Sequence, residues 1–434
     1  MKYLYILLGA VLFITSCDTD LDQSPPNIAS ADSLNDFDGV LNAAYFYQLG
    51  TVTPMAVMGD FRADNAFMFE APFDEFDMFN PDLIQMEDQF FSPFYTAAYR
   101  SILSTNIVVE NSTDNVEIAE ARFLRALTYF KLVRVFGDVT INLSDAPNPT
   151  DQSILARQPA STVYNDVIIP DLEAAIAGLP ATASAGRASG LAAEGLLGKV
   201  YVQMGNFGAA EPHLASVVNR ALEAGVALQG DYTTIFGFAN DLNPEILFAT
   251  QVSSSIVDEY GFSEFWSWSG GLDTKSLMPL EQSLIDAFDA SPGDLRRAVT
   301  IDEDLLMSPK FPQTDGPDHD WIELRLADVI LLYAEALNEG GNSSAALTEL
   351  NKIRSRAGLE DSNASSQGDI RTAIQNERRL ELAFEGQRWF DLVRTGTVNE
   401  AVGQSVDPGF HVFPIPESEV IAFDAITQNP AYER

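Results

Sequence analysis

The chain of 434 residues contains one cysteine, Cys17, and three histidines. A single cysteine cannot form a disulfide within the chain, so packing alone must hold the fold together. His213, His319 and His411 lack the spacing of a metal site, and no H-E-x-x-H occurs. The sequence also lacks a G-x-S-x-G motif and a phosphate-binding loop. We therefore expect no metal, no cofactor and no enzymatic reaction.

Positive charge is scarce. Lysine and arginine together number 25, against 63 acidic residues, for a formal net charge of −38. Nucleic-acid binding needs clustered cations, so this composition excludes a nucleic-acid partner. Long-range repulsion also disfavours a polyanionic ligand and favours a neutral one. The acidity is typical of a protein that stays soluble in a salty medium.

No apolar run is long enough to span a bilayer, which takes about 20 residues. The first apolar stretch, residues 3–14, follows Lys2 and ends just before Thr15, Ser16 and Cys17. This pattern is typical of a bacterial lipoprotein signal, so we expect residues 1–16 to be removed and Cys17 to be lipidated. The alternative is an ordinary secretory signal with a chance cysteine. Residues 17–30 are acidic and contain proline, which predicts a tether to an anchored, not embedded, protein.

The remainder is rich enough in apolar residues, 46% of the whole chain, to bury a substantial core. Apolar spacing near 3.6 residues predicts helices over 33–47, 118–136 and 161–178, with Pro170 bending or splitting the last one. Residues 52–95 hold many aromatics, prolines and aspartates without a steady period. We expect irregular segments and short helices there.

Two segments share the spacing of a tetratricopeptide helix pair. A third helix is expected over 375–394. We divide the chain at residue 225, into 31–225 and 226–434, and expect the block 226–320 to be an irregular insertion with a strand at 246–251. The predicted fold is all-α, a tetratricopeptide-like helical-pair scaffold with a large irregular ligand-binding lobe. The repeat residues are Leu197, Gly198, Tyr201, Ala210 and Leu214 in the first segment, and Leu326, Val329, Tyr333, Ala346 and Leu350 in the second.

Several stretches, in one order along the chain, carry a family resemblance. They are ARFLRA at 121–126, YFKLVRVFGD at 129–138, LRLADV at 324–329, YAEALN at 333–338, LNKIR at 350–354, ERR at 377–379, ELAFEG at 381–386, RWFDL at 388–392, FPIP at 413–416 and QNP at 428–430. Together with the lipoprotein signal, they resemble the SusD/RagB family of outer-membrane nutrient-binding lipoproteins.

The resemblance implies a scaffold of four tetratricopeptide-like pairs and an irregular lobe that binds ligand, in most members a glycan. It also implies a partner, a SusC-type TonB-dependent transporter of the outer membrane, over which the lipoprotein acts as a lid. The acidic residues after Cys17 look like the family's surface-export signal, which would place the protein on the cell exterior. The charged residues at 377–388 have i,i+3 and i,i+4 spacings, and we expect them to hold helix to helix.

Glycan binding needs aromatic rings for the apolar face of a sugar and planar polar groups for its hydroxyls. Tyr260, Phe262, Trp266 and Trp268 lie in a Gly/Ser-rich segment, 260–271, typical of a surface loop. In an extended backbone, Trp266 and Trp268 would point the same way, about 6.5 Å apart, and form one platform. The alternative is that these rings fill the core under a long loop.

A second candidate is the group Arg62, Asp64 and Asn65, whose side chains could bind sugar hydroxyls. Its alternative is a helix cap with an ion pair. Trp321 and Trp389 lie in segments of helical periodicity, so we assign both to the core.

An acidic loop that could hold Ca²⁺ contains Asp315, Asp318, His319 and Asp320. It lacks the spacing of an EF-hand, and a solvated surface loop is favoured.

The predicted function is therefore non-catalytic capture of oligosaccharide or polysaccharide at the cell surface. Two alternatives stay open. One is a tetratricopeptide-type scaffold that binds protein or peptide, which would not need the aromatic insertion. The other is a surface glycoside hydrolase, which needs two positioned carboxylates, and no motif in the sequence marks such a pair.

Overall fold

The computed structural model describes residues 36–60, 62–68, 71–148, 151–182, 186–252, 279–311 and 319–433. The chain divides into two units, Met1–Phe37 and Asp38–Arg434. The helices and strands of the described residues belong to the second unit. None of the described helices is both long and apolar enough to cross a membrane.

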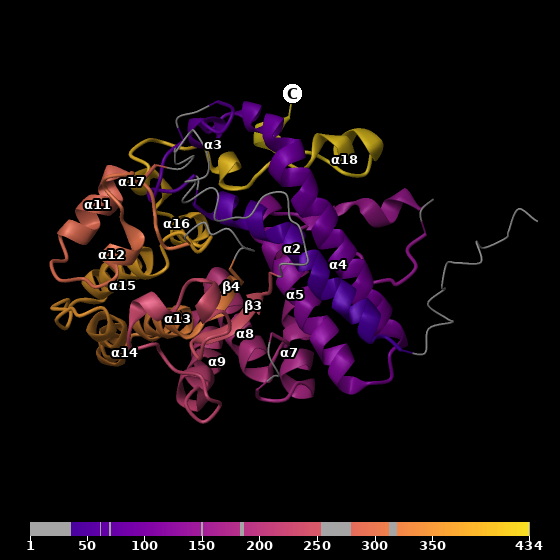
Figure 1. The fold of residues 1–434 in the computed structure, drawn as a ribbon. Coiled ribbons are helices and arrows are strands. Elements are labelled where there is room, and N and C mark those ends of the chain that lie inside the picture. Colours follow the sequence, from indigo (N-terminus) through magenta and orange to yellow (C-terminus); the bar gives the residue numbers. More distant parts are fainter. Residues whose placement is uncertain are drawn as a thin grey trace, which may run out of the picture. The chain divides into compact units, whose positions relative to one another are not determined.

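Helices dominate the second unit, and its strands form two small antiparallel sheets, β1–β2 and β3–β4 (Figure 1). The all-α prediction is thus confirmed. The long helices are α2 (Asp38–Asp60), α4 (Ser92–Asn111), α5 (Asn115–Phe136), α7 (Ile169–Gly178), α8 (Gly190–Gln203), α9 (Phe207–Arg220), α13 (Leu326–Glu339), α14 (Ser343–Arg356) and α15 (Gln367–Glu381). Shorter ones are α3 (Glu75–Met78), α6 (Ala160–Val163), α11 (Gln282–Asp289), α12 (Arg297–Thr300), α16 (Arg388–Thr395), α17 (Val398–Ala401) and α18 (Glu417–Ala422). The strands are β1 (Val139–Thr140), β2 (Arg157–Gln158), β3 (Ile246–Thr250) and β4 (Trp321–Arg325).

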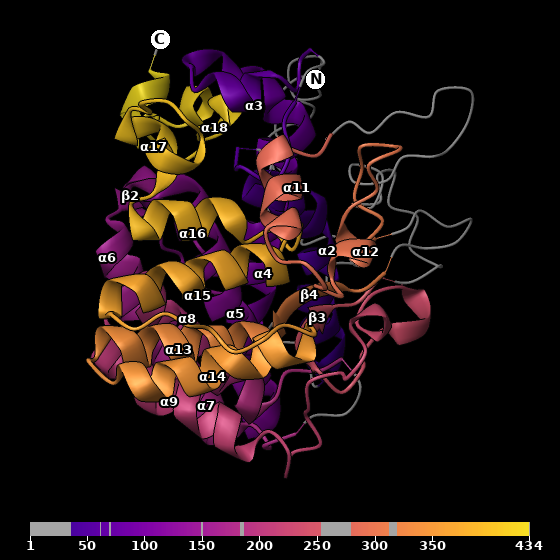
Figure 2. The same ribbon diagram turned by 90° about the vertical axis from the view of Figure 1, so that its left-hand side faces the viewer.

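The long helices pack in chain order, each against the next: α2 on α4, α4 on α5, α5 on α7, α7 on α8, α8 on α9, and α9 on α13. The two predicted repeats are the pairs α8–α9 and α13–α14. Gly198 is needed in the first pair, because a Cβ there would lie 2.5 Å from Leu214 Cδ2. The second pair and α15 share a core of aliphatic side chains that includes Leu331, Leu350 and Ile374 (Figure 2).

Helix α5 is coupled to the small β3–β4 sheet by a buried ion pair. Lys131 Nζ lies 2.5 Å from Glu323 Oε1 on β4, and it also donates to Thr51 Oγ1 on α2 at 2.9 Å. A charge buried without a partner is costly, so this contact holds the sheet in place on the scaffold.

Three local predictions need correction or detail. Helix α2 continues to Asp60, beyond the expected end at residue 47, because its second half is buried on nearly all sides and so loses the apolar/polar alternation. The expected helix over 375–394 is two helices, interrupted by Phe384 and Gly386, both at φ +66°. The helix at 161–178 is divided by a π-helical turn, Tyr164–Ile168, just before Pro170, which cannot donate a backbone hydrogen bond.

In the described part of the predicted insertion, the structure has two 3₁₀ turns, strand β3 and the short helices α11 and α12, and β3 confirms the predicted strand. Trp321 and Trp389 are buried, which confirms their assignment to the core. Trp321, however, lies on β4 and not on a helix, because the helical pattern begins only at Leu326.

Candidate functional site

The two segments selected from the sequence as glycan sites are joined through their flanks. Pro279, the first described residue after the aromatic segment, accepts a hydrogen bond from Phe67 N at 3.0 Å. Ala66 and Leu280 form a β-bridge, and Glu281 N donates to Asn65 O at 3.0 Å. The segment 62–68 therefore pairs with 279–281 along the backbone, although more than 200 residues separate them in sequence.

The other flank of the aromatic segment is held by the β3–β4 sheet. Val252 N donates to Asp320 Oδ1 at 2.9 Å, and Thr250 pairs with Trp321 across the strands. Burial raises the pKa of Asp320 to about 6, partly offset by that bond from Val252. Val252 and Pro279, the described residues on either side of the aromatic segment, are thus both hydrogen-bonded.

A buried cluster of four residues, Trp321, Gly386, Asp60 and Asn65, connects these two flanks. The indole of Trp321 packs on Gly386, where a Cβ would lie 2.9 Å from Trp321 Cζ2. Gly386 N donates to Asp60 Oδ2 at 2.8 Å, and Asn65 Nδ2 donates to Asp60 Oδ1 at 3.2 Å. Burial raises the pKa of Asp60 to about 7, even with these bonds to its carboxylate. The cluster is held in place because Asp60 accepts a hydrogen bond on each of its two carboxylate oxygens.

The side chain of Arg62 is also buried in the protein interior and does not face a ligand. Its side chain is fully buried, with Nε donating to Phe76 O at 3.1 Å and Nη1 to Phe410 O at 2.7 Å. Its guanidinium lies 4.7 Å from the ring centroid of Phe413. The expected role in binding hydroxyls thus gives way to a structural one, because the side chain is enclosed by aromatic rings and backbone carbonyls.

Asp64 and Asn65 are also buried and are bonded to arginines. Asp64 receives Arg388 Nε at 2.6 Å and Nη2 at 2.8 Å. Arg379 Nε donates to Asn65 Oδ1 at 3.1 Å. Burial alone would raise the pKa of Asp64, but Arg388 and Arg379 hold it below its usual value. As with Arg62, their side-chain groups bind protein and not solvent, which matches the alternative of a structural ion pair.

Trp266, Trp268, Tyr260 and Phe262 lie outside the described residues, so their role as a sugar platform stays a prediction. Cys17 lies outside them too, as do Asp315 and Asp318 of the acidic loop, while His319 and Asp320 of that loop are buried.

Among the described residues of the predicted insertion, Phe238 is an exposed ring that was not among the residues predicted from the sequence. Phe238, in the 3₁₀ turn Phe238–Asn240, is 57% exposed. The same turn leads into Asp241, which accepts a hydrogen bond from Asp320 N at 3.1 Å. The ring thus belongs to the same local structure as the flanks described above. A signal was present in the sequence, since Phe238 follows Gly237 in a stretch rich in turn-forming residues.

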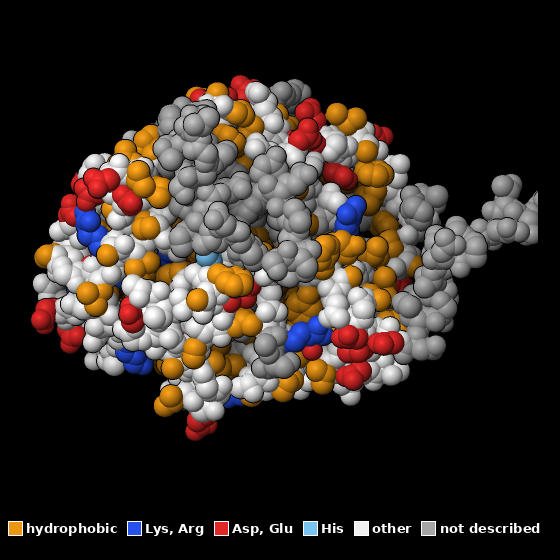
Figure 3. Space-filling model, in the orientation of Figure 1, with side chains coloured by type: hydrophobic (Ala, Val, Ile, Leu, Met, Phe, Trp, Pro, Cys, Tyr) orange, Lys and Arg blue, Asp and Glu red, His pale blue; other side chains and the backbone are white. Residues whose placement is uncertain are grey.

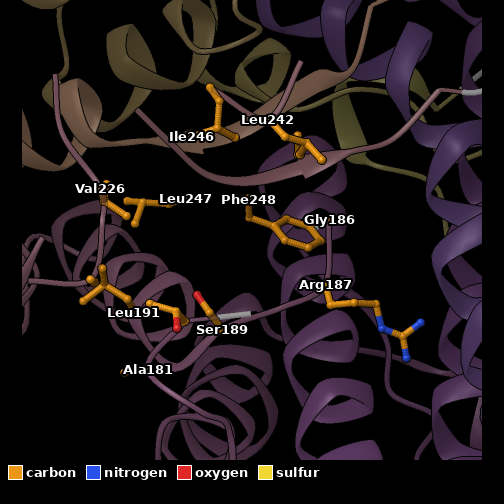
Figure 4. Close-up of a pocket in the computed structure, with 13 residues that line it drawn as sticks. Ala181, Gly186, Arg187, Ser189, Leu191, Val226, Leu242, Ile246, Leu247 and Phe248 are labelled. Carbon is orange, nitrogen blue, oxygen red and sulfur yellow. The ribbon is translucent and has the colours of Figure 1, made fainter. Parts of the chain in front are cut away.

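A cavity of about 160 Å³ lies between β3 and the connection from α7 to α8 (Figure 4). Aliphatic and aromatic side chains such as Leu191, Leu247 and Phe248 dominate its lining. Arg187 points away from the cavity in Figure 4, and it pairs with Glu120 at 2.7 Å. The polar side chains of Thr182 and Ser189 also line the cavity.

The surface is acidic, in keeping with the composition. Figure 3 shows carboxylates spread over the visible face, with fewer cations among them.

Comparison with known proteins gives consistent matches along the chain. A model described as the SusD family matches residues 306–432, and one described as starch-binding and associating with the outer membrane matches residues 18–202. SusD-like protein P2 of Formosa agariphila is 26% identical, in an alignment that covers 79% of this chain and 80% of that protein.

Solved structures share the fold. A laminarin-binding SusD-like protein has a TM-score of 0.74 at 24% identity, covering 91% of this chain and 99% of its own. Surface glycan-binding protein A from Bacteroides uniformis has a TM-score of 0.73 at 21% identity, covering 92% of this chain and 99% of its own. At such identities, the likeness establishes the architecture.

Proposed function

The chain belongs to the SusD/RagB family, and from this membership we propose that it captures oligosaccharide or polysaccharide at the cell surface without cleaving it. It then delivers the glycan to a TonB-dependent transporter of the outer membrane. The names of two relatives of the same fold, one laminarin-binding and one a surface glycan-binding protein, support a glycan as ligand.

The pairing of segment 62–68 with 279–281 supports the proposal most directly. It anchors one flank of the aromatic segment, and β3–β4 anchors the other. A binding loop held at both ends by a rigid scaffold is a common way to present recognition side chains. On this basis Trp266 and Trp268 form the sugar platform, with Tyr260 and Phe262 beside them and Phe238 as a further exposed ring.

The location follows from the N-terminus and the family. Residues 1–16 act as the lipoprotein signal, Cys17 carries the lipid, and the tether holds the protein on the outer face of the outer membrane. The family description of association with the outer membrane agrees with this placement. The net charge of −38 favours a glycan backbone that is largely neutral.

Native affinity electrophoresis against a panel of neutral and charged polysaccharides tests the proposal. We expect one class to retard the protein, and we expect the double variant Trp266→Ala, Trp268→Ala to lose affinity at least about tenfold, because it removes two apolar stacking surfaces. A matched control is Phe46→Ala, which removes an exposed ring on α2, outside the lobe.

Unchanged glycan affinity in the double variant would overturn the platform. A panel without any retarding glycan would overturn glycan capture. New reducing ends after incubation of the protein with the bound glycan would overturn the non-catalytic role.

A further inference from the structure

A second cavity, of about 330 Å³, lies beside the segment 62–68, which contributes Asp64 to its lining. Helices α15, α16 and α17 and the start of α11 surround it, on the face seen in Figure 2. Most of its lining is polar. Four arginines take part: Arg378, Arg379, Arg388 and Arg394.

This concentration of cations runs against the composition. Acidic residues outnumber lysine and arginine 63 to 25 in the whole chain. In the cavity, four arginines stand beside three carboxylates, Asp64, Asp391 and Glu400, a far higher share of cations than in the whole chain. Arginines gathered on one cavity wall can bind an anionic group wherever their N–H donors are not already used by the protein.

Two of the arginines are already committed to the protein. Arg378 Nη1 lies 2.7 Å from Asp328 Oδ1, and its Nε lies 3.0 Å from Asp391 Oδ2. Arg394 Nη1 lies 2.6 Å from Glu335 Oε1. These pairs are structural, so the ligand charge must be met by the other two.

Arg379 and Arg388 share a single carboxylate. Asp64 Oδ1 lies 2.6 Å from Arg388 Nε, and Asp64 Oδ2 lies 3.3 Å from Arg379 Nε. Two guanidinium groups thus bind one carboxylate. Glu281 lies near them, and burial and the charge of Asp64 raise its pKa.

Each of these guanidinium groups keeps one donor for a ligand. Within the described residues, the hydrogen bonds of Arg379 and of Arg388 use Nε and Nη2 only. Nη1 of each has no partner among the residues that the structure describes, and the side chains keep 12% and 14% of their surface exposed. Burial and the neighbouring Arg388 lower the pKa of Arg379 to about 10, so it remains charged at neutral pH.

Helix α15 adds a stripe of uncharged polar groups beside Arg379. Thr372, Gln375 and Asn376 line the same cavity, and with Arg379 they have the spacing i, i+3, i+4 and i+7 of a single helix face. Planar amides such as those of Gln375 and Asn376 suit sugar hydroxyls, because each offers a donor and an acceptor.

We propose that this cavity binds the carboxylate or sulfate group of an acidic sugar unit in the captured glycan. The Nη1 atoms of Arg379 and Arg388 meet the anion, and the amides of α15 meet the hydroxyls. The assignment rests on the proposed glycan capture and narrows it to a glycan with isolated acidic units, which the overall negative charge tolerates better than a dense polyanion.

The cavity also lies close to the anchored end of the aromatic segment. Ser283 lines it, accepts a hydrogen bond from Arg379 Nη2 at 2.8 Å, and donates to Asp64 O at 3.1 Å. Only three residues lie between Ser283 and Pro279, so these two residues are at most about 14 Å apart.

Calorimetric titration of the purified protein with three oligosaccharides of equal length, one neutral, one uronate-bearing and one sulfated, tests this assignment. We expect at least one acidic ligand to bind about tenfold more tightly than the neutral one. Arg379→Gln should abolish that difference, and Asn376→Ala, which removes an amide from the same helix face, should weaken acidic binding several-fold.

The matched control is Arg371→Gln, which removes the same charge from the same helix outside the cavity, where Arg371 pairs with Glu339 and is 43% exposed. Equal affinity for neutral and acidic ligands, or an equal effect of the two arginine variants, would overturn the anion site while leaving glycan capture intact. Free glucuronate and inorganic sulfate serve as further probes. If they bind in an Arg379-dependent manner while no oligosaccharide does, the anion site stands and glycan capture fails; if no probe binds, both fail.

Discussion

The two sides of helix α15 use charge in opposite ways. On the inner side, Glu377 and Glu381 are buried and bonded to arginines from other elements. On the outer side, Arg379 keeps an unbonded donor toward a cavity, next to the amides of Gln375 and Asn376. The comparison teaches that a stretch diagnostic of the family can serve the scaffold with one face and leave the other face for recognition.

The inner side is closed because each charge there meets several partners. Arg325 reaches Glu245 at 2.8 Å, Glu381 at 2.6 Å and Glu385 at 2.7 Å. Burial alone would raise the pKa of Glu381, but Arg356, Arg325 and Arg296 hold it far below its usual value. The network joins β4, α14 and α15 to the turn before α16, and it is this turn that carries Gly386 under the candidate site.

The largest expected effect comes from breaking the buried ion-pair network on the inner side of α15. Arg325→Met leaves three buried carboxylates without their shared cation, and we expect a loss of at least about 3–5 kcal/mol in the free energy of unfolding. Since a typical domain has only about 5–15 kcal/mol in total, the variant should be close to unfolding. Urea denaturation followed by circular dichroism measures the change.

Arg371→Met, which breaks the half-exposed pair with Glu339, is the matched change on the outer side of α15. Its expected cost is within about 1 kcal/mol. If both variants lost similar amounts of unfolding free energy, the buried charges on the inner side of α15 would contribute no more to stability than the exposed pair on its outer side.

A smaller effect tests whether shape as well as charge closes the inner side. Gly59 on α2 lies against the turn before α16, and a Cβ there would lie 2.3 Å from Gly386 C and O. Because a backbone cannot yield as a side chain can, Gly59→Ala should cost about 3 kcal/mol.

Gly39 begins the same helix and has no atom within 4 Å of its Cβ position. Gly39→Ala should therefore stabilise the protein by up to about 1 kcal/mol. Thermal unfolding of both variants measures the contrast, and a harmless Gly59→Ala would contradict the close approach.

The last effect is spread over a range of pH and concerns Asp60, the buried carboxylate beneath the site. Its pKa is raised by burial to about 7, against about 3.9 in an unfolded chain. Between pH 4 and 7 the folded state therefore holds a proton that the unfolded state has released. Stability should fall as pH rises through this window, by up to about 1.4 kcal/mol per unit.

Asp60→Asn should reduce that slope, measured by denaturant unfolding at each pH. Burial also raises the pKa of Asp77 to about 7 and that of Asp320 to about 6, so part of the slope should remain. The paired carboxylates Glu381 and Glu385, whose pKa values are lowered, act in the opposite direction, because their contribution is lost only as pH falls below about 4. An identical slope in the variant would show that Asp60 is ionised in the fold.

Helix prediction from the sequence succeeded for the pairs α8–α9 and α13–α14, whose repeat spacing includes the small residue at Gly198. The repeat pattern was sufficient there, although α8 and α13 are buried on nearly all sides. Prediction failed in the second half of α2, which is also buried on nearly all sides and carries no such repeat. It also missed the break before Arg388, because Phe384 adopts a left-handed conformation that only its surroundings select.

Site prediction divided in the same way. The sequence identified Arg62, Asp64 and Asn65 as polar groups in an irregular region, but it contained no information on their distant partners, such as Phe410 O for Arg62 and Arg388 for Asp64. It identified the residues at 377–388 as structural, which holds for Glu381. It missed that Arg379, two positions earlier, faces a cavity, because exposure depends on which helices pack nearby.

By itself, the sequence determined the helical class, the family and the excess of negative charge, since each follows from residue identity and local spacing. Only the tertiary structure decided which charged side chains are buried in ion pairs and which keep a donor toward a cavity. That outcome depends on contacts between residues tens to hundreds of positions apart. A charged group is bonded within the protein, or remains able to bind a ligand, according to the partners that folding brings within about 3 Å of it.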